Sequence, residues 1–171
     1  MSRRALLIVA ALVLAAGAAW YVAAPWLTLQ QMRAAAQADD ADALSAHVDY
    51  PALREDLKAE VMAQVMAEAQ KDKSGGGALG MAIGAAMVGP MIDGFVTPAG
   101  LKAAFAANRK KRAAGASMPA GNAFDVGEDV EIERRSFDEF VVGKPSGKDA
   151  RMVFRRHGLG WKLSGVDIPN L

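Results

Sequence analysis

The chain opens with an uncharged apolar segment over residues 5–24, which directly follows Arg3 and Arg4. About 20 apolar residues is the length that an α-helix needs to cross the hydrocarbon core of a bilayer. Because positively charged residues stay on the cytoplasmic side, the two arginines direct everything after Pro25 outward. The pattern therefore predicts a cytoplasmic basic start over residues 1–4, a single-pass inner-membrane anchor over residues 5–24, and a periplasmic domain behind it.

A cleaved secretory signal has the same charged start and apolar middle. Residues 16–18 are Ala-Gly-Ala, the small residues typical of a cleavage site. Against cleavage, Trp20, Tyr21 and Trp26 gather at the outer end of the segment, and such aromatic side chains mark a membrane–water interface. We favour a retained anchor, and the alternative is a domain that is secreted after cleavage.

Residues 27–112 form the predicted helical part of the exported domain. Thr28 and Gln31 have the spacing of a capping box, which predicts that a new helix begins just after the anchor. Asp49 stands where it would cap a further helix that has Pro51 in its first turn. The apolar stripe of that helix recurs in steps of four residues: Leu53, Leu57, Val61 and Val65.

Residues 78–96 are apolar and rich in glycine. Pro90 would kink a helix there, and Asp93 would be costly in lipid. We expect a broken helix that is buried in the soluble core. The alternative is a hairpin that associates with a membrane or with another copy of itself.

The hydrophobic period changes towards the end of the chain. Residues 113–128 are rich in glycine and alanine and predict a loop. Over residues 129–169, short alternating runs are joined by glycine turns, which predicts an antiparallel sheet of three or four strands. Helices first and strands last indicate an α+β fold, with the helices packed on one face of the C-terminal sheet.

Charge and cysteine content exclude several classes of function. All 19 acidic residues follow Pro25, together with 18 of the 20 basic residues, so the exported part is close to neutral. This balance argues against a nucleic-acid partner. Without cysteine, thiol nucleophiles, disulfides and cysteine-ligated metals are excluded. No hydrolase nucleophile motif occurs, so we predict no catalytic residue, no metal and no cofactor.

Several short runs resemble a known family when they are read in order. They are residues 21–25, 48–54, 96–98, 137–140 and 161–169. With the anchor in front, the chain resembles the uncharacterised bacterial family called domain-of-unknown-function family 2939. The resemblance implies an N-terminal anchor followed by a small α+β domain, and it implies no activity, substrate or catalytic residue. The order of helices and sheet also looks like the cone-shaped folds of the nuclear-transport-factor-2-like type.

The candidate positions for ligand or partner binding are Asp49, Tyr50, Arg54 and Trp161. Arg54 lies one turn after Asp49, and a guanidinium is suited to pair with a carboxylate. Trp161 is expected either in the core or, with Tyr50, at the mouth of a pocket. We predict a non-enzymatic domain that binds an envelope protein or a small apolar ligand. The alternative is an envelope enzyme with a cone-shaped pocket, in which Asp49 is the base and Arg54 or His157 gives electrostatic help.

Overall fold

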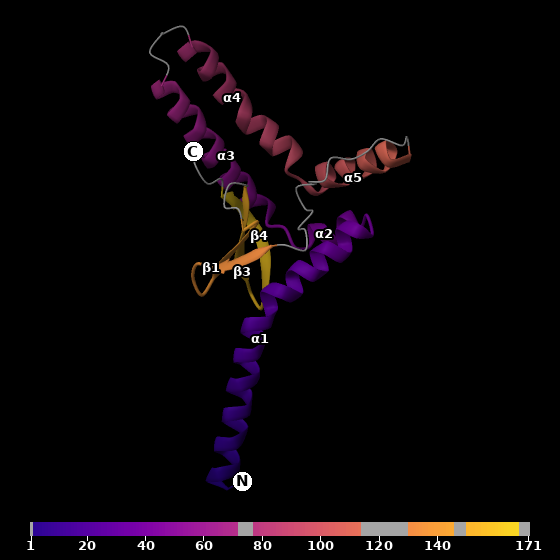
Figure 1. The fold of residues 1–171 in the computed structure, drawn as a ribbon, viewed down its shortest axis with the longest axis vertical. Helices are drawn as coiled ribbons and strands as arrows, with labels where there is room; N and C mark the ends of the chain where they lie inside the picture. The colour runs from indigo at the N-terminus through magenta and orange to yellow at the C-terminus, as the bar shows by residue number, and fades with distance from the viewer. Residues whose placement is uncertain (1, 72–76, 114–129, 146–149, 168–171) are drawn as a thin grey trace.

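The computed structural model describes residues 2–71, 77–113, 130–145 and 150–167 (Figure 1). In these ranges, five helices precede four strands, and the predicted α+β class is confirmed. The predicted loop over residues 113–128 lies outside the described ranges except for its first residue. The elements are α1 (Arg3–Gln37), α2 (Ala41–Ser45), α3 (Tyr50–Lys71), α4 (Gly77–Phe95), α5 (Pro98–Ala113), β1 (Glu131–Arg134), β2 (Glu139–Gly143), β3 (Arg151–His157) and β4 (Gly160–Asp167).

The long helix α1 continues from the apolar segment into the core without a break, although it contains Pro25. Its N-terminal half stands free of the other elements (Figure 1). The prediction of a new helix at Thr28 is wrong, because Thr28 Oγ1 donates to Ala24 O at 3.1 Å inside the same helix. From Ala24 onward one side of α1 is buried, and its apolar core residues are Ala24, Leu29, Met32 and Ala35.

The four strands form an antiparallel meander in the order β1-β2-β3-β4. The segment before α3 covers the outer edge of β4, where Val48 forms a parallel bridge to Leu163. Asp49 N donates to Leu163 O at 2.9 Å, and Leu163 N donates to His47 O at 2.8 Å. This short pairing protects an edge that would otherwise expose unpaired backbone groups.

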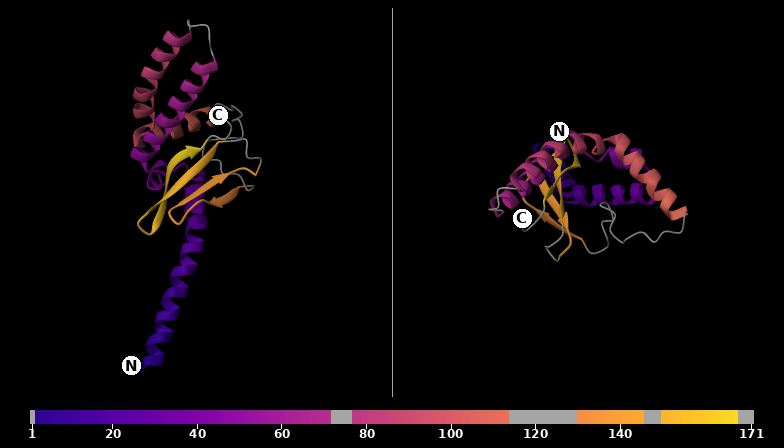
Figure 2. Two further views of the ribbon diagram at one scale, coloured as in Figure 1. Left: turned by 90° about the vertical axis from the view of Figure 1, so that its left-hand side faces the viewer. Right: turned by 90° about the horizontal axis from the view of Figure 1, so that it is seen from above.

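The core lies between the sheet and the second half of α1, and Figure 2 shows the strands lying against the middle of that helix. Phe140 and Phe154 are cross-strand neighbours whose rings stack with centroids 4.8 Å apart. Trp161 meets Phe140 edge to face at 4.9 Å and is only 2% exposed. Such aromatic pairs contribute beyond the area that they bury. The structure therefore places Trp161 in the core.

Helices α3 and α4 form a hairpin that projects away from the sheet, at the end of the molecule opposite the N-terminus of α1 (Figure 1). The prediction of a broken, buried helix over residues 78–96 is wrong, because α4 is continuous and its described outer side is exposed. Pro90 also lies on the exposed side. Water can therefore solvate the carbonyl that Pro90 leaves without a donor, and the helix persists.

One carboxylate of α3 is hydrogen-bonded to the backbone of β4. Asp56 Oδ2 accepts from Val166 N at 2.8 Å, close to the register irregularity between β3 and β4. Gly165 allows this approach, since a Cβ atom there would lie 2.6 Å from Asp56 Cγ. The absence of a side chain at residue 165 is thus a condition for this hydrogen bond between α3 and the sheet.

We predict that Gly165→Ala lowers the free energy of unfolding by about 1–3 kcal/mol, because the displaced carboxylate leaves Val166 N–H without its acceptor. Denaturant unfolding of the full chain in detergent measures this loss. Gly160→Ala on the same strand is the matched control, since the nearest atom to its Cβ would be His157 O at 4.0 Å. Equal losses in the two variants would contradict the role given to Gly165.

Candidate functional site

Two of the predicted site residues hold the start of α3. Asp49 Oδ1 accepts from Ala52 N at 3.2 Å, so Asp49 caps the helix as its position in the sequence suggests. The Tyr50 hydroxyl donates to Ser45 Oγ at 2.9 Å and its ring packs against the core. Both side chains therefore connect α3 to the preceding segment.

The third predicted residue, Arg54, turns away from Asp49. Its Nη1 donates to Val96 O at 3.1 Å, and its Nε lies 3.7 Å from Asp93 Oδ1. Lys58 Nζ approaches the same carboxylate oxygen at 2.6 Å. The predicted pair of Arg54 with Asp49 is wrong. Arg54 pairs with Asp93 instead, because the α3–α4 hairpin brings the end of α4 beside Arg54. The pair joins the two helices at the base of the hairpin.

An open groove of about 210 Å³ lies between α1, the α2–α3 connection and the β3–β4 hairpin. Trp161, the fourth predicted residue, lines it, and Asp49, Tyr50 and Arg54 are not part of its lining. The groove therefore does not unite the predicted set.

Both histidines of the chain, His47 and His157, line this groove, a meeting that their distance in sequence gave no reason to expect. Burial lowers the pKa of His47 below its usual value of 6.5, and the positive charge of Lys162 lowers it further. His47 is therefore neutral at neutral pH. Within the described residues, no group of three or more potential metal ligands occurs.

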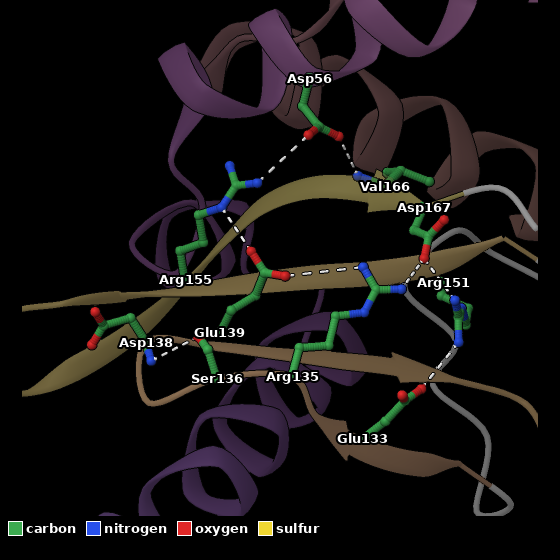
Figure 3. Close-up of polar contacts among 10 residues, drawn as sticks. All are labelled: Asp56, Glu133, Arg135, Ser136, Asp138, Glu139, Arg151, Arg155, Val166 and Asp167. Carbon is green, nitrogen blue, oxygen red and sulfur yellow. Dashed lines mark hydrogen bonds and ion pairs between the residues drawn. The ribbon is translucent and has the colours of Figure 1, made fainter.

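Apart from the groove, a cluster of charged side chains covers the face of the sheet that points away from α1 (Figure 3). Arg151 Nη2 donates to Asp167 Oδ2 at 2.7 Å, and Arg135 donates to the same oxygen. Arg155 Nε donates to Glu139 Oε2 at 3.1 Å. These side chains pair across neighbouring strands, and such pairs stabilise a sheet, although Arg151 Nε is buried without a hydrogen-bond partner. We therefore assign this cluster to stability and not to ligand binding.

The arginines set the titration of Asp167. Burial alone would raise its pKa, but hydrogen bonds from Arg135 and Arg151, together with their positive charges, hold the pKa below the usual value of 3.8. Asp167 is thus ionised throughout the neutral range. Its ion pairs with Arg135 and Arg151 stabilise the sheet until acid protonates the carboxylate.

A third cluster lies where α1 passes the tips of the two β-hairpins, and we call it the α1–sheet junction. It consists of Trp20, Tyr21, Arg134, Phe137, Arg156 and Leu159. Trp20 Nε1 donates to Leu159 O, and the Tyr21 hydroxyl donates to Phe137 O, each at 3.4 Å. The rings of Tyr21 and Phe137 stack with centroids 4.9 Å apart. Both hairpin tips are therefore attached to α1.

Two arginines complete the α1–sheet junction. Pro25 has no N–H, so the carbonyl of Tyr21 lacks its helical donor four residues on. Arg134 Nη2 donates to that carbonyl at 3.3 Å, and its Cζ lies 4.2 Å from the Tyr21 ring centroid. Arg156 Cζ lies 4.9 Å from the Phe137 centroid. These contacts join residues far apart in the chain, and their one local signal in the sequence is Pro25 close to Trp20 and Tyr21.

Helix α1 is also the one helix among the described residues that is long and apolar enough to cross a membrane, and none of its apolar window is buried. Its length and composition agree with the predicted anchor.

A family model described as "Protein of unknown function (DUF2939)" matches residues 13–104, more than half of the chain. The chain belongs to this family. The matched range begins inside α1 and ends inside α5. It therefore includes Trp20 and Tyr21 of the α1–sheet junction and none of the junction's residues from the sheet. No curated protein and no solved structure matches the chain, and the likeness to cone-shaped folds stays a prediction.

We predict that Asp167→Asn flattens the loss of stability in acid. The folded-state pKa of Asp167 lies below its unfolded value, so its contribution is complete above the unfolded pKa and is lost as the pH falls through the folded one. Denaturant unfolding between about pH 6 and about pH 2.5 should show a shallower decline for the variant than for the wild type. Asp138→Asn, which removes a carboxylate at an exposed turn of the same sheet, is the matched control. A parallel decline in all three proteins would contradict this role.

Proposed function

We propose that the chain is a single-pass inner-membrane protein whose periplasmic domain binds a partner protein without catalysis. The observation that carries this proposal is the continuity of α1, whose free half is apolar and whose other half belongs to the core. An apolar helix that no other element covers needs a lipid environment, since water would solvate it poorly. The domain is then held at a fixed place next to the bilayer.

The proposed binding surface is the outer side of the α3–α4 hairpin. Met87, Met91 and Phe95 are spaced by four residues on one side of α4 and are 60%, 55% and 72% exposed. Residues 77–92 carry no charge, and Asp93 is neutralised by Lys58 and Arg54. An uncharged surface with flexible methionine side chains suits an apolar segment of another protein. We therefore propose an envelope protein with an apolar helix as the partner.

The groove beside α1 supports a small apolar ligand less well. Its volume of about 210 Å³ is smaller than the roughly 300–1,000 Å³ of typical ligand pockets. The alternative of an enzyme that uses Asp49 and Arg54 also loses support, because Asp49 caps α3 and Arg54 pairs with Asp93. Neither side chain is placed to meet a substrate in the groove.

The alternative of membrane association through residues 78–96 is limited by geometry. The α3–α4 hairpin and the free half of α1 lie at opposite ends of the molecule (Figure 1). While α1 keeps this direction, α4 points away from the bilayer that α1 spans. A protein partner is therefore the better match for the exposed side of α4.

Photo-crosslinking tests the binding surface. We predict that p-benzoyl-phenylalanine at Met91 of the full chain, in intact cells, gives an adduct with one protein of the envelope. The same amino acid at Lys102, an exposed position on α5, is the matched control and should not give that adduct. Met91→Glu, combined with the crosslinker at Met87, should reduce the yield at least about tenfold, because a charge must be desolvated in the interface. Adducts only with lipid, or only with a second copy of the chain, would contradict the proposal. An equal yield of the protein adduct from Lys102 would also contradict it.

A reporter fusion tests the proposed orientation. We predict that alkaline phosphatase joined after Leu171 is active, since the positive-inside rule places residues after Pro25 outside the cytoplasm. Green fluorescent protein at the same position should be dark when it is exported in unfolded form. Bright fluorescence with an inactive phosphatase would show the opposite orientation.

A further inference from the structure

We propose that the α1–sheet junction is a second membrane contact, at which the β1–β2 and β3–β4 turns rest in the anionic headgroup layer of the bilayer that α1 spans. This inference rests on the proposed anchor and adds a docked orientation of the domain to it. The side chains that enter the layer are Phe137 and Leu159, one from each turn.

The height of the two turns along α1 carries the argument. They are attached to Trp20 and Tyr21, within the last turn of the apolar segment over residues 5–24. With a rise of 1.5 Å per residue, Trp20 lies about 6 Å inside the outer boundary of that segment. A span of this length fills the hydrocarbon core, so both turns lie at the boundary between that core and the headgroup layer when α1 spans the membrane.

The side chains at this height are those that favour an interface. Phe137 is 64% exposed and Leu159 is 77% exposed, although each turn is fixed to α1 by a hydrogen bond. Trp20 beside them is also exposed. Aromatic rings with a polar atom collect at the headgroup level, and here their polar atoms are already used to hold the turns. The exposed side chains of the two turns thus extend the apolar surface of the free half of α1.

Charge at the turns agrees with an anionic lipid surface. Arg134 and Arg156 lie over the rings of the junction, and Lys162 lines the groove beside it. Asp138 is the only carboxylate in the two turns at residues 135–138 and 158–159. Arg135, the other charged residue of these turns, is neutralised by Asp167. The remaining excess of positive charge faces the bilayer, where it attracts anionic headgroups.

The absence of cysteine from the chain allows a direct test in the full protein. Single cysteines replace Phe137 and Leu159 and carry a nitroxide spin label, whose depth is read from its accessibility to oxygen and to a water-soluble nickel complex. Labels at Leu12, in the proposed span, and at Met91, on α4, are the references for lipid and water. The vesicles consist of phosphatidylcholine, without or with phosphatidylglycerol.

We expect the labels at residues 137 and 159 to report the headgroup layer, at a depth between those of Leu12 and Met91. We expect them to lie deeper when phosphatidylglycerol is present. If both labels are as accessible to nickel as Met91 while Leu12 lies in lipid, the anchor stands and the docked orientation is wrong. If Leu12 is also accessible to nickel, the anchor itself is wrong. Equal depth in the two kinds of vesicle would overturn the requirement for anionic headgroups.

Discussion

The continuity of α1 past Pro25 is the constraint on which the rest of the structure depends. A proline inside a helix removes one hydrogen bond and leaves a carbonyl without a donor, and near lipid such a carbonyl is expensive. Here Arg134 from the sheet donates to the Tyr21 carbonyl. Just beyond the proline, Thr28 adds a bond to the carbonyl of Ala24. Arg134 thus compensates for the proline, and one helix continues from the apolar segment into the core.

The position of the sheet follows from this constraint. Arg134 reaches Tyr21 only if the β1–β2 turn lies beside the outer end of the apolar segment, and the hydrogen bond from Trp20 places the β3–β4 turn there as well. The aromatic core of Phe140, Phe154 and Trp161 then packs against the next turns of α1. The hairpin of α3 and α4 is left to project at the far end (Figure 1). The free apolar half of α1 and the α3–α4 hairpin are thus separated at opposite ends of the molecule.

Local features of the fold could be predicted from the sequence. The apolar helix, the α+β order of elements, the cap at Asp49 and the helical stripe of α3 all depend on residues close together in the chain. The new helix expected at Thr28 was wrong because a capping box is a weak preference that tertiary packing overrides. The buried helix expected over residues 78–96 was wrong because an apolar composition does not specify what covers it.

The candidate site depended on contacts between distant residues, and these could not be predicted. Asp93 and Arg54 meet because two helices pair, whereas the partner that we expected for Arg54, Asp49, is close to it only in sequence. The histidines in the groove and the arginines over Tyr21 likewise come together through the sheet. Periodicity identifies elements, whereas the residues that join elements are determined by their packing.

The most direct test of this account is the distance between the apolar half of α1 and the sheet in a lipid bilayer. Nitroxide labels at Leu12 and at Glu131, an exposed residue of β1, report this distance by pulsed electron–electron double resonance on the full chain. A rigid α1 that is bound to both β-turns predicts one narrow distribution, and Pro25→Ala should preserve it. A broad or multimodal distribution would show a hinge between the apolar segment and the domain, and would contradict the central claim.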